Sequence, residues 1–191
     1  MSVDIPGSTG WRDDMRKHLI EKRQAIPVAT RKEADALLAH RLEELLTEVS
    51  GRTISIYWPF RGEPDLRAFA RGCRDRGATI ALPLVVRKAA PLEFREWREE
   101  DQLERGVWNI PVPPQSAPLS QPDIVIAPVV GVDAQSFRLG YGGGFFDRSL
   151  AALRDAKTAI AIGVGYEMQR METIHPHHFD IPMDHVLLAK A

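Results

Sequence analysis

The sequence has little that would assign it to a secreted, membrane or nucleic-acid-binding class. It contains one cysteine, Cys73, so an internal disulfide is excluded and a reducing compartment, the cytoplasm, is the expected location. Its 25 basic and 26 acidic residues give a net charge of -1, which argues against a nucleic-acid partner held by bulk electrostatics. No apolar run approaches the length of a membrane span and no signal peptide is evident, so we expect no membrane partner.

Several common catalytic signatures are also missing. No Ser-His-Asp or Cys-His nucleophile is recognisable. A glycine-rich stretch, residues 140–144, is not a Walker A loop, because no Gly-Lys-Ser/Thr follows, and it lacks the third glycine of a dinucleotide fingerprint. The cluster of His175, His177, His178 and His185 fits no standard zinc spacing, so surface histidines are favoured over a zinc site.

What remains is an ordinary globular composition, with 191 residues, 44% hydrophobic and 27% charged. We expect a flexible leader at residues 1–10 and one domain at residues 11–191. Apolar runs predict strands at 53–58, 79–84, 92–97, 123–128 and 158–165, and amphipathic spacing predicts helices at 11–24, 30–49 and 64–76. The second helix would begin at a capping box, Thr30 with Glu33, and the third at Pro64. This alternation predicts a layered α/β fold with a mostly parallel sheet.

The segment Arg138–Arg148 reads RLGYGGGFFDR and lies between a predicted strand and the start of a helix. Glycines let backbone N–H groups approach a ligand, and a helix start favours an anion. Arg138 adds a permanent forked charge, and Asp147 could hold a divalent cation. The segment therefore predicts a phosphate-binding loop with a magnesium ligand, rather than a loose turn with a solvated salt bridge.

Other candidate residues have simpler alternatives. Arg12 and Arg16 lie four apart on one helix face, which by itself is typical of a solvated basic surface. Glu63 and Asp65 flank a helix start after a strand, where α/β sheets keep ligands but where acids also simply cap helices. Trp108 could equally be a core residue.

The central segment resembles the signature of the 5-formyltetrahydrofolate cyclo-ligase family, R-L-G-x-G-x-G-Y-Y-D, with Phe145 and Phe146 in place of the two tyrosines. Weaker similarity covers nearly the whole chain, including W-N-I-P-x-P at 108–113 and the acids Asp180 and Asp184. Ser136 stands where the family has glycine, which we expect to be tolerable only if its φ is negative.

The resemblance implies a three-layer Rossmann-like sandwich and an enzyme that uses ATP and Mg²⁺. We expect a monomer or a homodimer, between which the sequence does not choose. ATP would phosphorylate the formyl oxygen of 5-formyltetrahydrofolate, N10 would close the ring, and 5,10-methenyltetrahydrofolate, ADP and phosphate would form. A catalytically idle or substrate-shifted paralog that binds nucleotide or folate, and a sugar-phosphate isomerase on a related scaffold, are the alternatives.

The resemblance also assigns residues to roles. Arg138 and Asp147 would be catalytic, and Asp147 and Asp180 would hold Mg²⁺. The nucleotide would contact Arg12, Arg16, Arg138, Leu139, Gly140, Tyr141, Gly142, Gly143, Gly144, Phe145 and Phe146. Folate would contact Phe60, Trp108, Phe145, Phe146 and one or both of Glu63 and Asp65, between which the sequence does not choose. A Phe in place of Tyr removes a possible hydrogen bond to substrate.

Overall fold

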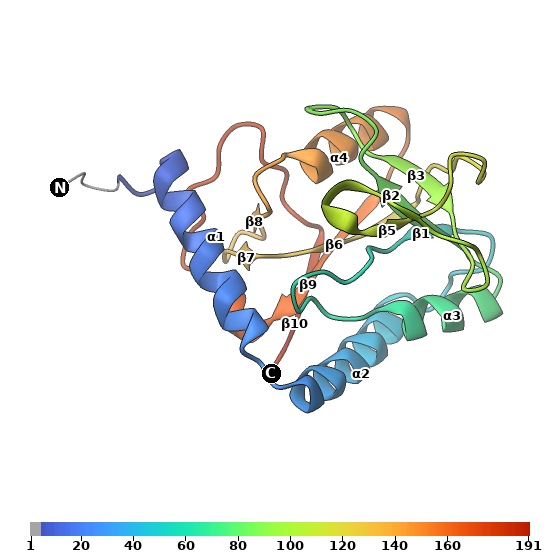
Figure 1. The fold of residues 1–191 in the computed structure, drawn as a ribbon, viewed down its shortest axis with the longest axis horizontal. Coiled ribbons are helices and arrows are strands. Elements are labelled where there is room, and N and C mark those ends of the chain that lie inside the picture. Colours follow the sequence, from blue (N-terminus) through green and yellow to red (C-terminus); the bar gives the residue numbers. More distant parts are fainter. Residues whose placement is uncertain (1–4) are drawn as a thin grey trace.

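The computed structural model describes residues 5–191, and the elements are labelled in Figure 1. Its four α-helices are α1 (Thr9–Gln24), α2 (Val28–Leu45), α3 (Arg67–Asp75) and α4 (Phe145–Ala156). The main sheet contains β1 (Thr53–Ser55), β2 (Thr79–Leu84), β3 (Glu93–Glu96), β6 (Ile124–Pro128), β9 (Ile160–Tyr166) and β10 (His185–Ala189). Of the predicted leader, residues 1–4 lie outside the described part, and α1 already includes Thr9 and Gly10.

The six strands are ordered β10-β9-β6-β1-β2-β3, and only β3 runs antiparallel to its neighbour. Ile54 of β1 pairs with Ile80 on one side and Ile124 on the other. All five residues of β6 are buried, as expected for a central parallel strand covered on both faces. The prediction of an α/β fold with a mostly parallel sheet is confirmed.

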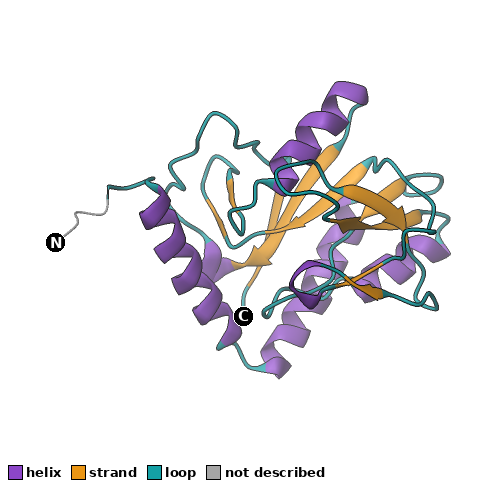
Figure 2. Cartoon of the chain, turned by 45° about the horizontal axis from the view of Figure 1, so that its top comes forward, coloured by secondary structure: helices purple, strands orange, loops and turns teal. Residues whose placement is uncertain are grey.

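Helices cover both faces of this sheet (Figures 1 and 2). Leu38 and Leu42 of α2 and Phe69 of α3 pack on one face, with alternate strand residues such as Ile54 and Ile126. Val125, Ala127 and Ala161 point to the other face, where they meet Leu150 and Leu153 of α4. The period-two alternation of the strands thus separates two apolar layers, which gives the predicted three-layer arrangement.

Helix α1 stands beside the sheet and packs against a small antiparallel pair, β7 (Gly131–Val132) and β8 (Arg138–Leu139). Leu19 and Ile20 form this contact with Leu139. A second antiparallel pair, β4 (Glu104–Arg105) and β5 (Pro111–Val112), encloses the short helix η1 (Val107–Asn109). A further short helix, η2 (Glu167–Gln169), follows β9. Within residues 5–191, no helix combines the length and apolar character needed to cross a membrane.

Two predicted helix starts are wrong. Helix α2 begins at Val28 after Pro27, without a side-chain cap, so the expected capping box of Thr30 and Glu33 does not form. Helix α3 begins at Arg67, and the carbonyl of Pro64 instead accepts a hydrogen bond from the Tyr57 hydroxyl (2.9 Å). For α2 the earlier Pro27 overrides the local capping preference, and for α3 the contact of Pro64 with Tyr57 does so. The strand β10 was not predicted.

The turn between β7 and β8 departs from expectation at Ser136, whose φ is +67°. We expected serine to be tolerated here only at negative φ, and the structure contradicts that condition. The turn is stabilised by Asp133, whose Oδ1 accepts hydrogen bonds from the backbone N–H of Gln135 (3.1 Å) and Phe137 (2.9 Å). Its Oδ2 accepts the N–H of Ile174 (3.2 Å), so a buried carboxylate with three donors holds the strained residue in place.

Candidate active site

One cleft opens at the carboxyl ends of the parallel strands β1, β2 and β6, where open α/β sheets place ligands. Its walls come from α1, the loop after β1, the β4–β5 pair, the end of β6, the loop before α4 and the segment before β10. These elements are far apart in the sequence but come together around the carboxyl ends of the central strands (Figure 1). Residues from distant parts of the chain therefore line a single cleft.

The glycine loop, residues 140–144, connects β8 to α4 and lines this cleft. Gly142 and Gly144 have φ of +92° and +63°, conformations that side chains rarely adopt. A Cβ on Gly140 would lie 2.5 Å from Nη1 of Arg138, so a side chain at that position would displace the Arg138 guanidinium. Helix α4 starts directly after the loop without a side-chain cap, which leaves its first N–H groups available to an anion.

Three arginines, Arg12, Arg16 and Arg138, line the cleft around this loop. Arg16 donates from Nε to the carbonyl of Gly140 (2.7 Å). Arg12 and Arg138 are 7% and 5% exposed, and within residues 5–191 the Nε of each has no hydrogen-bond partner. Burial lowers the pKa of Arg138 while nearby Asp147, Asp180 and Glu63 raise it, and a guanidinium remains charged at neutral pH. Buried cations with unused donors fit an anionic ligand such as a polyphosphate.

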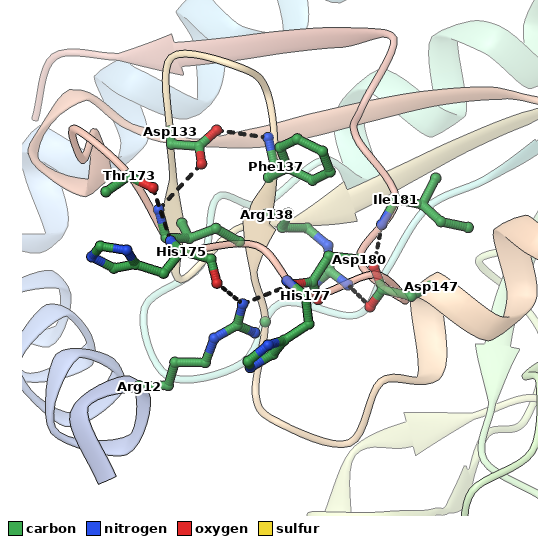
Figure 3. Close-up of polar contacts among 12 residues, drawn as sticks. Arg12, Asp133, Phe137, Arg138, Asp147, Thr173, His175, His177, Asp180 and Ile181 are labelled. Atoms are coloured by element: carbon green, nitrogen blue, oxygen red, sulfur yellow. Dashed lines mark hydrogen bonds and ion pairs between the residues drawn. The ribbon is translucent and has the colours of Figure 1, made fainter. Parts of the chain in front are cut away.

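The two acids predicted as metal ligands lie beside Arg12 and Arg138 (Figure 3). Asp147 accepts hydrogen bonds from Nη2 of Arg138 (3.4 Å) and from the N–H of Ile181 (3.2 Å). Asp180 accepts from Nη2 of Arg12 (2.7 Å) and the N–H of His177 (2.7 Å), both through Oδ2. Residues 5–191 hold no group of three or more potential metal ligands. Two carboxylates nevertheless fit Mg²⁺, which takes only one or two carboxylate ligands from protein.

The other half of the cleft is aromatic and holds one buried acid, Glu63. The rings of Phe60 and Trp108 are parallel within 7°, with centroids 6.1 Å apart, and Tyr141 lies tilted beside both. The Glu63 carboxylate accepts hydrogen bonds from the N–H of Phe60 (2.9 Å) and the hydroxyl of Tyr141 (2.6 Å). Burial raises the pKa of Glu63, and the nearby charge of Arg23 opposes that rise. Such a pocket suits a flat ring with adjacent N–H donors.

Comparison with known proteins decides the family. Residues 8–189 match the 5-formyltetrahydrofolate cyclo-ligase family. The chain belongs to this family. It is 32% identical over 187 residues to the cyclo-ligase of Mycolicibacterium smegmatis, covering 94% of each chain. It is 28% identical to that of Haemophilus influenzae, covering 95% of this chain and 99% of the relative.

The fold agrees with that assignment. The structure superposes on a 5,10-methenyltetrahydrofolate synthetase from Mycoplasma pneumoniae with a TM-score of 0.74 at 22% sequence identity. The match covers 92% of this chain and 96% of the other. The Rossmann-like cyclo-ligase fold expected from the resemblance is thus confirmed.

The cyclo-ligase cleft gathers most of the predicted site residues but excludes two. Leu139 is fully buried and packs with Leu19 and Ile20 instead of facing the cleft, because alternate strand residues point to opposite sides. Asp65 is not part of the lining, and its carboxylate binds the guanidinium of Arg67 (2.6 Å). Of the two candidate acids, the geometry therefore favours Glu63.

The histidine cluster also lies outside the cleft lining. His175 contributes its carbonyl, which accepts a hydrogen bond from Arg12 (2.7 Å), while its ring packs edge-on against Trp11. His177 contributes the N–H that Asp180 accepts, and the His178 ring lies tilted against exposed Phe179. Of this cluster, His175 and His177 therefore contact site residues, and both do so through their backbone.

Two phenylalanines stand in this cyclo-ligase where the family signature has tyrosines, and their rings lie in the cleft as expected. Phe145 and Phe146 both line the cleft at the start of α4. The guanidinium of Arg138 lies 5.0 Å from the centroid of the Phe146 ring, and the Phe145 ring fills the space where a Cβ of Gly143 would be. With these two hydroxyls absent, Tyr57 and Tyr141 are the tyrosines of the described lining.

Sequence reasoning missed the apolar walls of the cleft and the arginine behind it. The missed lining residues are Tyr57, Trp58, Leu82, Pro83, Val85, Leu92, Val107, Ile110, Pro111, Val112 and Pro128. From sequence alone, apolar residues at strand ends cannot be distinguished from core residues. Pro128 did carry a signal, because it ends a predicted strand and α/β sheets bind ligands at the carboxyl ends of their strands. Arg23 gave no signal, because an arginine in an amphipathic helix is normally exposed, yet this one is fully buried.

Proposed function

We propose that this cyclo-ligase converts 5-formyltetrahydrofolate and ATP to 5,10-methenyltetrahydrofolate, ADP and phosphate within the cleft described above. The observation that carries the proposal is the convergence of buried arginines, a glycine loop and two acids with an aromatic pocket around Glu63. The cyclo-ligase relatives support the reaction, and the cleft supports the placement of its two substrates.

In this proposal the triphosphate lies against the glycine loop and the start of α4. Arg12, Arg16 and Arg138 neutralise it, and backbone N–H groups of the loop orient it. Within residues 5–191 the Nε of Arg12 and of Arg138 has no partner, so a turn of either guanidinium towards phosphate would break no hydrogen bond at Nε. Asp147 and Asp180 would hold Mg²⁺, whose charge would neutralise the phosphates when it is bound.

The pterin ring of folate enters the aromatic half of the cleft. The aromatic side chains of Phe60 and Trp108 line it, and Glu63 accepts hydrogen bonds from its N–H groups. Phe145 and Phe146 lie where the aromatic half meets the glycine loop. This placement brings the formyl oxygen towards the γ-phosphate.

The chemistry then requires position and charge more than a protein nucleophile. The γ-phosphoryl group moves to the formyl oxygen, which converts that oxygen into a leaving group. N10 of the same folate attacks the activated carbon, and phosphate departs with the former formyl oxygen. Because N10 is already tethered within the substrate, the protein contributes mainly by orienting the groups, neutralising phosphate charge and excluding water.

The test is direct. Purified protein with 5-formyltetrahydrofolate and Mg-ATP should develop the near-ultraviolet absorbance of the methenyl product, and omission of ATP should abolish it. Retained ATP binding without this absorbance would contradict the proposed reaction and point to a binding module. We also propose a cytoplasmic location, in keeping with the single buried thiol of Cys73. A monomer or homodimer stays a prediction, which light scattering would test.

A further inference from the structure

Three side chains from separate elements form a hydrogen-bonded cluster in the wall of the cleft: Arg23 of α1, Tyr141 of the glycine loop and Glu63 of the loop after β1. Tyr141 and Glu63 line the cleft, and Arg23 lies buried behind them. We propose that Tyr141, held by Arg23, is a positioning residue that couples nucleotide binding to folate binding. The inference rests on the proposed function, since it requires both substrates in one cleft. Tyr141 belongs to the glycine loop, and its side chain contacts the aromatic wall and Glu63.

Arg23 determines the direction of this hydrogen-bonded chain. Its guanidinium is fully buried and donates to the carbonyls of Arg61 (3.0 Å) and Val129 (3.2 Å) and to the Tyr141 hydroxyl (2.5 Å). An arginine can only donate, so the Tyr141 oxygen must accept from it. The single proton of the hydroxyl is then left for Glu63, whose Oε1 lies 2.6 Å away.

The chain therefore has one polarity, from Arg23 through Tyr141 to Glu63. Burial and the neighbouring Glu63 raise the pKa of Tyr141 well above its usual value, so the hydroxyl keeps the proton that it donates. Glu63 also accepts the N–H of Phe60 through Oε2 (2.9 Å). Two donors thus fix the plane of the carboxylate that would receive the pterin.

Tyr141 is also part of the phosphate-binding backbone. Its neighbours are Gly140, whose carbonyl accepts a hydrogen bond from Arg16 (2.7 Å), and Gly142, which has a φ of +92°. The Tyr141 ring contacts the aromatic wall, with centroids 6.1 Å from Phe60 and 5.8 Å from Trp108. Any adjustment of the loop to a triphosphate is thereby transmitted to Glu63 and to the folate pocket. By linkage, the factor by which bound nucleotide changes the affinity for folate equals the factor by which bound folate changes the affinity for nucleotide.

The experiment measures that factor directly. Calorimetry gives the Kd of a non-hydrolysable ATP analogue with Mg²⁺, in the absence and in the presence of saturating 5-formyltetrahydrofolate. We expect folate to tighten nucleotide binding by about fivefold or more in the unmodified protein, the lower end of ordinary coupling. The coupling ratio is the nucleotide Kd without folate divided by the nucleotide Kd with folate. Tyr141→Phe, which removes only the hydroxyl, should bring this coupling ratio to within about twofold of one.

Tyr166→Phe is the matched control, because Tyr166 is buried on β9, outside the cleft lining, and loses the same atom. It should keep the unmodified coupling ratio. A purely structural role for Tyr141 would weaken both ligands equally and leave the ratio unchanged, and that result would overturn the proposal. A ratio of one in the unmodified protein would also overturn it.

If Tyr141→Phe does not fold, Arg23→Lys serves as the second variant. Lysine keeps the charge but loses the fork that reaches Arg61, Val129 and Tyr141 together, so the coupling ratio should fall here as well. The methenyl assay on the unmodified protein separates the two hypotheses. An active enzyme with an unchanged ratio in these variants contradicts only the coupling, whereas an inactive one contradicts the proposed function itself.

Discussion

At the scale of the residue, the cleft depends on charged groups held almost out of water. Arg138 is 5% exposed, and its partners are the carbonyl of Pro128, at 3.4 Å, and the carboxylate of Asp147, also at 3.4 Å. Both contacts are long for charge-assisted hydrogen bonds, so the guanidinium is only loosely satisfied. An anion that entered the cleft would find this charge already desolvated and in place.

Arg138→Ala should therefore weaken ATP binding by about 10- to 100-fold, since a hydrogen bond to a charged group contributes about 1.5–3 kcal/mol. Titration calorimetry with a non-hydrolysable analogue measures the effect. Arg71→Ala is the control, because Arg71 is an exposed arginine paired with Glu99 on the surface and should leave affinity unchanged. Unaltered affinity in Arg138→Ala would remove this residue from the nucleotide site.

Asp147→Asn tests the proposed metal role. Asparagine retains an acceptor for the N–H of Ile181 but loses the negative charge, so the Mg²⁺ concentration for half-maximal rate should rise about tenfold. Rate against Mg²⁺ at fixed ATP is the measurement, and Asp65→Asn, outside the cleft, is the control. An identical magnesium curve in Asp147→Asn would contradict the assignment.

Glu63 should impose a pH dependence on folate use. Burial raises its pKa, so protonation begins at a higher pH than for an ordinary glutamate, and the neutral carboxyl is the weaker acceptor. We expect kcat/KM for folate, at saturating Mg-ATP, to fall on the acid side with a midpoint above the usual glutamate range. Glu63→Gln, which cannot ionise, should be slow and should lack that acid limb. Retention of the limb in this variant would assign it to another group.

At the scale of the element, the site depends on how helices and turns are anchored rather than on their local sequence preferences. Helix α1 supplies Arg12, Arg16 and Arg23, all of which reach inwards, although a basic helix face is usually solvated. The β7–β8 turn sets the position of Arg138 and is held by Asp133 with Ser136 in a left-handed conformation. Backbone strain in this turn is offset by buried hydrogen bonds.

Ser136→Gly should therefore stabilise the protein. Left-handed backbone costs a side-chain-bearing residue about 1–2 kcal/mol, and part of that gain is lost to the greater freedom of glycine when unfolded. We expect the free energy of unfolding to rise by about 0.5–1 kcal/mol in denaturant titration. Ala134→Gly, in the same turn but without positive φ, should lower it instead. A lower stability for Ser136→Gly would show that the turn is not strained.

At the scale of the whole molecule, the cleft joins segments from nearly every part of the chain. Arg12 and Asp180, paired at 2.7 Å, are separated by 168 positions in the sequence, and Arg23 and Tyr141 by 118. Ligands that bind across such contacts hold α1, the glycine loop and the segment before β10 together. Their binding should stabilise the entire fold rather than one loop.

Saturating Mg-ATP, at about 100 times its Kd, should add about 2.7 kcal/mol to stability and raise Tm by about 5–10 °C. Differential scanning calorimetry provides the measurement, with 5-formyltetrahydrofolate as an independent second ligand. Arg138→Ala should lose most of the ATP shift but keep the folate shift. No shift with either ligand in the unmodified protein would contradict the placement of both substrates in this cleft.

The sequence by itself determined the features that local pattern controls. Strand β2 occupies the predicted residues 79–84, and β6 and β9 lie within two residues of prediction, because β-branched apolar runs specify buried parallel strands. The glycine motif likewise indicated the family and most of the residues around the glycine loop that line the cleft. These signals depend only on residues that are neighbours in the sequence, so they do not require the tertiary structure.

Tertiary structure alone decided which side chains face the cleft. It selected Glu63 over Asp65, turned Leu139 into the core, buried Arg23 and accepted Ser136 at positive φ. Leu139 packs on Leu19, Arg23 donates to Tyr141, and the turn of Ser136 is anchored to Ile174 through Asp133, all partners brought close only by folding. Asp65, by contrast, is held by its near neighbour Arg67. The energy of a buried charge or a strained turn resides in those long-range contacts, and no local pattern encodes it.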